Sequence, residues 1–231
     1  MENLACCTAI MNRLPQFAQV FEANLDTMRQ HPDCEWVILD YGSSDGLAQF
    51  LLSRQLPENV RPFRAEASRW HASIAKNLGI DCSEASLVMT LDADNRIGSA
   101  PALVARMHPD EIVHNWSGRY LDGTFGRILL SRATFYDRLG GYDESFLPMA
   151  HQDSDLLQRA RALGMVVRHI PCDPESAVNN TKGDSVANCQ GVSWGEMKRS
   201  NAIRSRYHIA NGQLRVARAA APPACSPLRR A

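Results

Sequence analysis

Short apolar runs, each about the length of a β-strand, alternate along the chain with longer segments whose apolar residues recur at helical spacing. Such alternation predicts one α/β domain with a mostly parallel central sheet flanked by helices. The predicted strands cover residues 4–10, 35–39, 60–63, 86–91, 111–115, 127–131 and 165–170. The predicted helices cover residues 14–30, 46–55, 69–80, 99–107, 132–139, 153–163 and 193–209.

The composition is that of an ordinary folded protein. The chain has 231 residues, 45% of them hydrophobic, and 25 basic residues balance 25 acidic ones. A chain of this length buries roughly 70–75% of its unfolded surface, so a core without disulfides is expected. No stretch of about 18 apolar residues and no signal-like N-terminus is present, which predicts no membrane span and a cytoplasmic location. The seven scattered cysteines have no zinc-ligand spacing and are expected to be reduced thiols.

The charges are unevenly placed. No Asp or Glu follows Glu196, whereas eight Lys and Arg residues do. We therefore expect a single domain over residues 1–212 and a basic, disordered tail over residues 213–231. Such a tail suits either solvent or peripheral contact with an anionic membrane surface. It lacks the interleaved aromatic residues that nucleic-acid binding needs, so no nucleic-acid partner is expected.

Polar residues follow two predicted strands, where ligands bind in open α/β sheets. The segment DYGSSDG after the second strand begins with Asp40, which leaves the strand end, although a turn needing these residues only for its geometry explains the segment equally well. The fourth strand ends in Leu91, Asp92, Ala93 and Asp94. Two carboxylates so close repel each other unless they are solvated or bind a cation, which indicates a Mg²⁺ or Mn²⁺ site.

A third polar group lies in the segments GGYDE, residues 140–144, and QDSDL, residues 152–156. Asp153 and Asp155 point about 200° apart around a helix, so they do not share one task. Asp155 is spaced to pair with Arg159 one turn later. Asp153 is either a general base at the mouth of the sheet or a carboxylate stabilised by the helix N-terminus.

Together these segments resemble the motifs of inverting, family-2-like glycosyltransferases with the GT-A fold. The turn from Asp40 to Asp45 is similar to the family's nucleotide-binding turn, and HASIAKNLG, residues 71–79, is similar to its segment ending in a basic residue, Asn and Gly. Asp92 to Asp94 resembles the metal-binding DxD motif. The segments at 140–144 and 152–156 resemble the GGxDE and EDxDL block of the galactosyltransferase and chondroitin-polymerase type. The resemblance spans residues 4–170.

The resemblance implies a role for each matching residue. It makes Asp153 the catalytic base, and it places Asp94 and Asp92 on a Mn²⁺ or Mg²⁺ ion. The donor nucleotide would contact Asp40, Tyr41, Lys76 and Asp92. The acceptor or the sugar would contact Trp116, Gly141, Tyr142 and Gln152, although core or rim packing is the alternative for both aromatic residues. A third metal ligand or a diphosphate contact would come from Asn180 or Lys182.

The implied activity is metal-dependent transfer, with inversion, of a hexose from a nucleotide-diphosphate donor, preferably UDP-linked, as in polysaccharide biosynthesis. The acceptor hydroxyl would belong to a glycan, a lipid-linked saccharide or a small molecule. Tyr41 stands where the family has Asp, Gln152 stands where it has Glu, and a later histidine ligand is missing. These departures leave open a catalytically silent module that binds nucleotide or glycan. A sugar-nucleotide pyrophosphorylase is disfavoured, because no glycine-rich phosphate loop follows the first strand.

Overall fold

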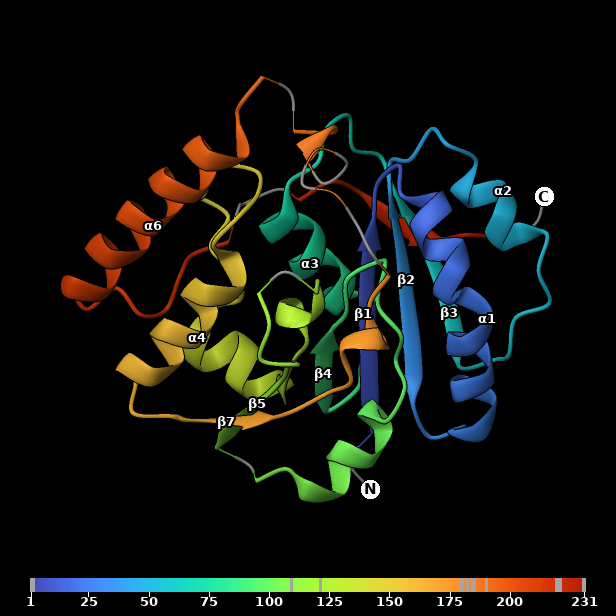
Figure 1. The fold of residues 1–231 in the computed structure, drawn as a ribbon, viewed down its shortest axis with the longest axis horizontal. Helices are drawn as coiled ribbons and strands as arrows, with labels where there is room; N and C mark the ends of the chain where they lie inside the picture. Colours follow the sequence, from blue (N-terminus) through green and yellow to red (C-terminus); the bar gives the residue numbers. More distant parts are fainter. Residues whose placement is uncertain are drawn as a thin grey trace.

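The computed structural model describes residues 3–108, 110–120, 122–178, 181, 183, 186–189, 191–218 and 222–229. Within this part of the chain, one sheet has the strand order β7-β5-β6-β4-β1-β2-β3-β8 (Figure 1). Strands β6 and β8 run antiparallel to the others, so the predicted mostly parallel sheet is confirmed. The strands are β1 (Leu4–Ile10), β2 (Glu35–Tyr41), β3 (Val60–Ala65), β4 (Leu87–Thr90), β5 (Glu111–Asn115), β6 (Ile128–Ser131), β7 (Val166–Ile170) and β8 (Cys225–Pro227).

The helices lie close to their predicted positions, but two of them have a different type. Residues 100–106 form a 3₁₀-helix and residues 134–139 a π-helix, η3, which ends at Gly140 in the left-handed conformation. The α-helices are α1 (Leu14–Gln30), α2 (Leu47–Leu52), α3 (Ala72–Asp81), α4 (Gln152–Ala162) and α6 (Trp194–Ala210). None of the helices in the described residues is long and apolar enough to span a membrane.

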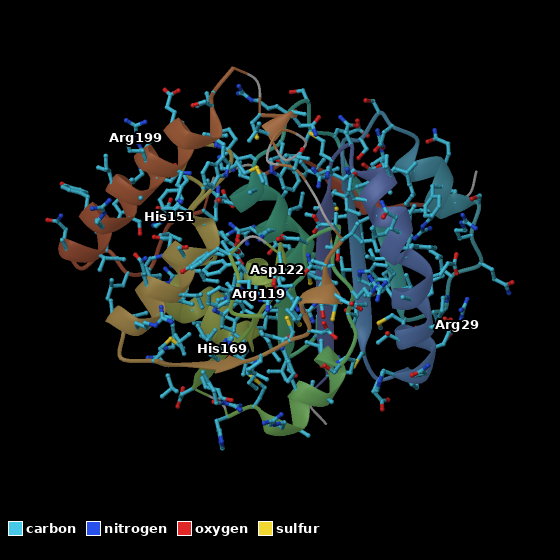
Figure 2. The ribbon with its side chains drawn as sticks, viewed as in Figure 1. Arg29, Arg119, Asp122, His151, His169 and Arg199 are labelled. Atoms are coloured by element: carbon cyan, nitrogen blue, oxygen red, sulfur yellow. The ribbon has the colours of Figure 1, made fainter. Side chains whose placement is uncertain are left out.

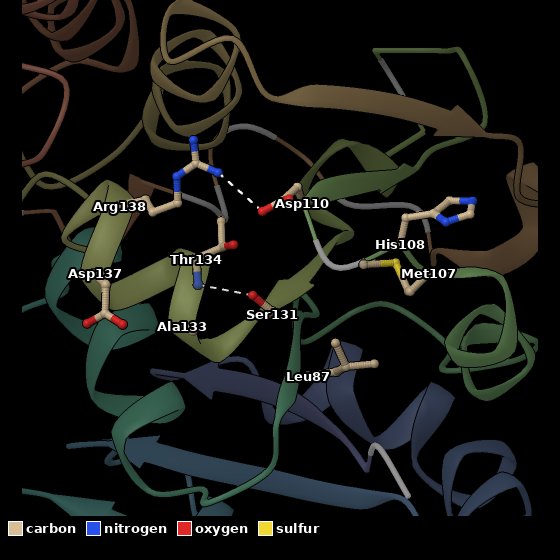
Figure 3. A pocket seen from close by; sticks show the side chains of 9 residues that line it. All are labelled: Leu87, Met107, His108, Asp110, Ser131, Ala133, Thr134, Asp137 and Arg138. Atoms are coloured by element: carbon tan, nitrogen blue, oxygen red, sulfur yellow. Dashed lines mark hydrogen bonds and ion pairs between the residues drawn. The ribbon is translucent and has the colours of Figure 1, made fainter.

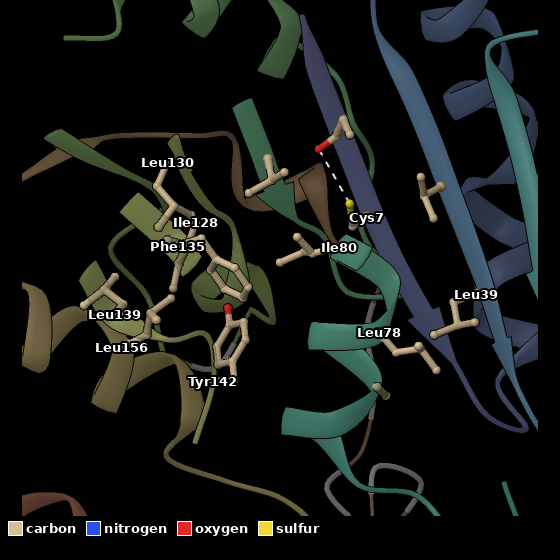
Figure 4. Packing of buried hydrophobic residues seen from close by; sticks show 14 of the residues in the cluster. Cys7, Leu39, Leu78, Ile80, Ile128, Leu130, Phe135, Leu139, Tyr142 and Leu156 are labelled. Carbon is tan, nitrogen blue, oxygen red and sulfur yellow. Dashed lines mark hydrogen bonds between the residues drawn. The ribbon is translucent and has the colours of Figure 1, made fainter. Parts of the chain in front are cut away.

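Helices cover both faces of the sheet, because alternate residues of each central strand point to opposite sides. In β1, Ala5 and Cys7 belong to one buried cluster with residues of α3, η3 and α4, of which Figure 4 labels Cys7, Leu78 and Leu156. Leu4 and Cys6 pack instead with the aromatic side chains of α1. Burial on both faces explains why these strands are continuous apolar runs rather than alternating ones.

A buried ion pair joins α4 to the segments around it. Arg159 and Asp155 are almost wholly buried, and Arg159 Nε donates to Asp155 Oδ2 at 2.7 Å, as the spacing predicts. The same guanidinium donates to the carbonyl oxygens of Leu139, Gly141 and Leu214. One arginine thus connects η3, the glycine turn and the segment after α6.

Replacing Arg159 with methionine should lower the free energy of unfolding by about 3–5 kcal/mol, because Asp155 and three carbonyl groups lose their donor inside the core. Urea unfolding followed by circular dichroism measures this loss. Arg161→Met is the matched control, since Arg161 is exposed on the same helix and should change stability by less than about 0.5 kcal/mol. Equal stability of the two variants would contradict the assigned role of the ion pair.

The segment after α6 was expected to be a disordered tail, but its described residues make ordered contacts with the domain. β8 pairs antiparallel with β3, Val216 is buried, and Arg218 bridges Asp81 and Glu144. A three-residue strand is too short to leave a periodic signal, which explains why the sequence pattern missed it. The domain boundary at residue 212 stays a prediction, and residues 219–221, 230 and 231 lie outside the described residues.

Candidate active site

A cleft of about 520 Å³ opens at the carboxyl ends of the parallel strands. Its walls come from the residues that follow β1, β4 and β5, the turn before β6, and the start of α4. Five predicted site residues line it together: Lys76, Asp92, Asp94, Gln152 and Asp153. The cleft therefore brings the predicted base and both predicted metal ligands together, although the five residues are up to 77 positions apart in the sequence.

Lys76 connects two of the carboxylates. Its Nζ donates to Asp153 Oδ1 at 2.8 Å and lies 3.2 Å from Asp92 Oδ1. Burial of the ammonium favours its neutral form, but the two carboxylates outweigh this effect and hold the pKa of Lys76 well above its usual value. Lys76 is therefore a fixed cation between the end of β4 and the start of α4.

Tyr142 also contacts Asp153, from the core of the domain. Its ring is fully buried, and its Oη lies 3.1 Å from Asp153 Oδ1 and 3.2 Å from Thr90 Oγ1. Burial and then the nearby Asp153 charge raise the pKa of Tyr142, so the phenol keeps its proton. Asp153 thus has one oxygen, Oδ1, fixed by an ammonium and a phenol, while the residue lines the cleft.

The loop after β4 is held by the chain beyond β7. Asp94 O accepts from Val178 N at 2.8 Å, and Arg96 N donates to Ser176 O at 2.7 Å. The Asp94 carboxylate is nearly buried, accepts from Asn95 Nδ2 at 2.9 Å and lies 3.6 Å from Arg13 Nη2. These contacts fix the direction in which the Asp92 to Asp94 segment faces the cleft.

The donor set of this loop fits a hard divalent cation that a substrate helps to coordinate. Mg²⁺ and Mn²⁺ accept one or two carboxylates together with phosphate oxygens and water, and Asp92 and Asp94 both line the cleft. Among the described residues, no group of three or more His, Cys, Asp or Glu side chains forms a complete metal cage. Asn180 and Lys182, predicted as a third ligand or diphosphate contact, lie outside the described residues.

α4 begins from a strained turn. Ala150 and His151 both have positive φ, 73° and 74°, a conformation that costs energy for residues other than glycine. The buried Asn201 of α6 holds this turn, since its Nδ2 donates to Ala150 O at 2.8 Å and its Oδ1 accepts from Leu147 N at 2.7 Å. The turn delivers Asp153 to the cleft in the first turn of α4, while Asp155 faces the core.

Asp40 and Tyr41 do not line the cleft in this structure. Asp40 is fully buried, with Oδ1 accepting from Ser43 N at 2.8 Å and Oδ2 accepting from Arg64. Tyr41 belongs to the core and meets Trp70 edge to face. Burial, and then the charge of Glu144, raise the pKa of Tyr41 to about 12. Their predicted nucleotide contacts stay predictions, and Trp70 rather than Tyr41 reaches the cleft wall.

Trp116, Gly141 and Tyr142 were predicted to contact the sugar or the acceptor. None of the three lines the cleft, and each contributes to the packing of the fold. Trp116 stacks on His114, with ring centroids 5.2 Å apart, and Tyr142 is in the core, which was the alternative for both. Gly141 has φ of 90°, and a Cβ there would lie 2.8 Å from Asn77 Oδ1. Asn77 binds both backbone groups of Tyr142, so the missing side chain makes room for α3 rather than for a sugar.

Several residues that line the cleft were not predicted. Arg13 lies in the loop that follows β1, so the expectation that ligands bind beyond the ends of the strands applies to it as well. Arg13 Nη1 and His151 Nε2 are buried without a hydrogen-bond partner among the described residues, and burial lowers the pKa of His151. Tyr120 is 71% exposed and stacks on Phe125. Figure 2 shows Arg119 and Asp122 near the middle of the molecule and His151 at the start of α4.

His169 lies within an apolar run of the sequence, from Val166 to Ile170. It is exposed on β7, an edge strand of the sheet, and its Nδ1 lies 3.2 Å from His114 O (Figure 2). Apolar residues on an edge strand face partly outward, as Val166 does at 62% exposure.

A smaller hollow of about 350 Å³ lies at the other end of β4 (Figure 3). It is formed around Leu87, where β4 begins, and Ser131, where β6 ends, with Asp110, Asp137 and Arg138 at its rim. Arg138 Nη1 lies 3.5 Å from Asp110 Oδ1, an exposed pair. This hollow is at the amino ends of the parallel strands, away from the predicted site residues.

Comparisons with known proteins identify the family of the chain and similar folds. The family model described as Glycosyl transferase family 2 matches residues 6–141, which include Asp92 and Asp94 but not Asp153. No curated protein matches the sequence.

Solved structures are similar in fold. S. aureus TarS residues 1–349 in complex with UDP-GlcNAc is 13% identical, with a TM-score of 0.65 over 94% of this chain and 67% of that one. The match to another TarS structure covers 59% of its length. A mannosyltransferase from Pyrobaculum calidifontis with GDP-Man and Mn²⁺ is 16% identical, with a TM-score of 0.59 over 92% and 71%. A Drosophila β-1,4-galactosyltransferase 7 mutant with manganese, UDP-Gal and xylobiose is 10% identical, with 0.58 over 89% and 80%.

Proposed function

Because the chain belongs to glycosyl transferase family 2, we propose that it transfers a sugar, with inversion, from a nucleotide-diphosphate donor to an acceptor hydroxyl. The observation that carries the proposal is the joint presence of Asp92, Asp94 and Asp153 in one cleft at the carboxyl ends of the strands. Ligands of open α/β sheets bind at that edge.

Asp153 is the proposed general base. Lys76 keeps a positive charge beside it and donates to its Oδ1, which holds the carboxylate in place. As the acceptor oxygen attacks the anomeric carbon from the side opposite the diphosphate, Asp153 takes the hydroxyl proton. Tyr142 and Lys76 hold Oδ1, so we assign the proton to the other oxygen, Oδ2, which no described hydrogen bond occupies.

Positive charge for the diphosphate has two proposed sources. A Mn²⁺ or Mg²⁺ ion bound by Asp92 and Asp94 supplies a Lewis acid for the departing diphosphate when it is present. Arg13 lies beside Asp94, and its buried Nη1 has a hydrogen bond to give to a phosphate oxygen. We therefore place the diphosphate between Arg13 and the Asp92 to Asp94 segment.

The donor is proposed to be UDP-linked, in keeping with the UDP-sugars bound to two of the similar structures. A glycan, a lipid-linked saccharide or a small molecule is the proposed acceptor, and polysaccharide biosynthesis the proposed context. A cytoplasmic location, with peripheral membrane contact through the basic C-terminal residues, likewise stays a prediction.

A silent module that binds nucleotide or glycan is the second candidate. It is favoured by Tyr41, which is buried in the core where the family's turn has an acidic residue. Slow hydrolysis of the donor in the absence of acceptor separates the two candidates, since only an active transferase releases the nucleotide diphosphate.

The donor and the metal are tested together by thermal unfolding. A ligand at about 100 times its Kd stabilises the folded state by about 2.7 kcal/mol, so UDP with Mn²⁺ should raise the Tm by roughly 5–10 °C. A chelator should reverse most of this rise. Asp94→Asn should remove the Mn²⁺-dependent part, because one of the two carboxylates is lost.

The matched control is Asp110→Asn, which changes an exposed carboxylate at the other end of β4 and should respond to UDP and Mn²⁺ as the unmodified protein does. GDP and ADP are measured in the same series. A protein that no nucleotide stabilises, with or without Mn²⁺, would overturn the proposed donor site.

A further inference from the structure

Two cysteines from distant parts of the sequence meet at the edge of the domain. Cys82 follows the last residue of α3, and Cys225 is the first residue of β8. Their Sγ atoms are 3.2 Å apart, within hydrogen-bonding distance of each other, and both side chains are partly exposed. The other described cysteines are buried, except for Cys172, for which no sulfur contact exists among the described residues.

The backbone around the two sulfurs is fixed from both sides. Cys225 is paired with Ala65 of β3, and Cys82 N donates to Leu78 O at 3.2 Å at the end of α3. Next to them, Arg218 binds Asp81 and so fastens the C-terminal segment to the same helix end. The contact between the two sulfurs is therefore a property of the fold and not of one mobile side chain.

We propose that Cys82 and Cys225 form a reversible disulfide when the protein is oxidised by a peroxide. The two sulfurs need to approach by only about 1.2 Å to reach the bond length near 2.0 Å. Their partial exposure gives a small oxidant access, which the buried cysteines lack.

The two thiols have different parts in the reaction. Contact with Cys82 lowers the pKa of Cys225, so we assign Cys225 as the thiolate that attacks. Its sulfur displaces hydroxide from hydrogen peroxide and becomes a sulfenic acid. The Cys82 sulfur then attacks that sulfur, its proton leaves with the displaced hydroxide as water, and two thiols and one peroxide have become one disulfide and two waters.

The bond would fasten the C-terminal segment to the domain. Arg218 also reaches Glu144, whose Oε1 accepts from Asn77, and Asn77 binds the backbone of Tyr142. A disulfide at residues 82 and 225 therefore secures a segment whose contacts continue to the residue that holds Asp153. Independently of any sugar transfer, it closes a loop of the unfolded chain and stabilises the fold.

The test treats the full-length protein with hydrogen peroxide, then denatures it and counts the thiols that react with an alkylating agent. The alkylated count should fall by two, peptide mapping should find residues 82 and 225 linked, and a reducing thiol should restore both. The Tm of the oxidised protein should rise by about 5 °C or more.

Cys82→Ser and Cys225→Ser should abolish the linked peptide and the rise in Tm, whereas Cys172→Ser, which removes another partly exposed thiol, should leave both unchanged. The proposal is overturned if both cysteines of the peroxide-treated protein remain alkylatable, if they are linked to other cysteines, or if the single variants gain the same stability. None of these outcomes depends on the donor or the acceptor.

Discussion

Replacing Asp153 with asparagine is expected to lower turnover by about 10²- to 10⁴-fold, which is the usual contribution of a positioned general base. Asparagine has nearly the same shape and still accepts from Lys76 and Tyr142, but it does not take a proton. Donor binding should stay within about twofold of the unmodified protein, since Asp153 is placed on the acceptor side of the reaction. Turnover is measured as nucleotide released from the donor that the unfolding experiments identify, with and without acceptor.

Asp137→Asn is the control for this variant. Asp137 lies at the second hollow, at the opposite end of β4 (Figure 3), so its loss should change neither turnover nor donor affinity. If Asp153→Asn retained turnover within about threefold of the unmodified protein, Asp153 would not be the base, and a search for another proton acceptor would begin with His151 on the same cleft wall.

Lys76→Met is expected to lower turnover by roughly 10²-fold, because Asp153 loses the ammonium that fixes its Oδ1. Asp92 and Asp153 would then face the cleft without the charge between them. Because the pKa of Lys76 is held well above its usual value, the charge that this variant removes is present throughout the pH range of the assay. Turnover is measured as released nucleotide, as for Asp153→Asn.

The conservative variant Lys76→Arg distinguishes charge from packing. It keeps the cation, so it should retain more turnover than Lys76→Met. Equal turnover of Lys76→Met and the unmodified protein would refute the role of Lys76 in holding Asp153. A loss of the same size in both variants would mean that the length and shape of the lysine side chain matter and its charge does not.

The sequence predicted the sheet well because its strands are buried on both faces. β1 and β5 have the predicted bounds, and α1 spans the predicted residues 14–30. Long apolar runs and a repeating helical face are local signals, so the elements that they predict are still present once tertiary contacts have formed. β8 has only three residues and gains its structure entirely from β3, so no local signal exists for it.

The candidate site was predictable as far as the strand-end rule reaches. Asp92 and Asp94 follow β4, whereas Asp153 was assigned as the base from the resemblance of residues 152–156 to the family's motif, and it lines the same cleft. The rule does not say which way a side chain turns after the strand ends. Tyr41 and Tyr142 turn into the core because neighbouring elements leave space there, and that space depends on Trp70, Asn77 and the rest of the fold.

The short strand β8 also has a consequence for solubility. A sheet edge with unpaired backbone groups is a template on which another molecule of the same protein can add its own strand. β8 occupies three positions of β3, Phe63 to Ala65, and Leu228 N donates to Pro62 O just beyond them. Proteolysis that removed the last residues would uncover this edge, and we expect the shortened protein to self-associate before it loses its fold.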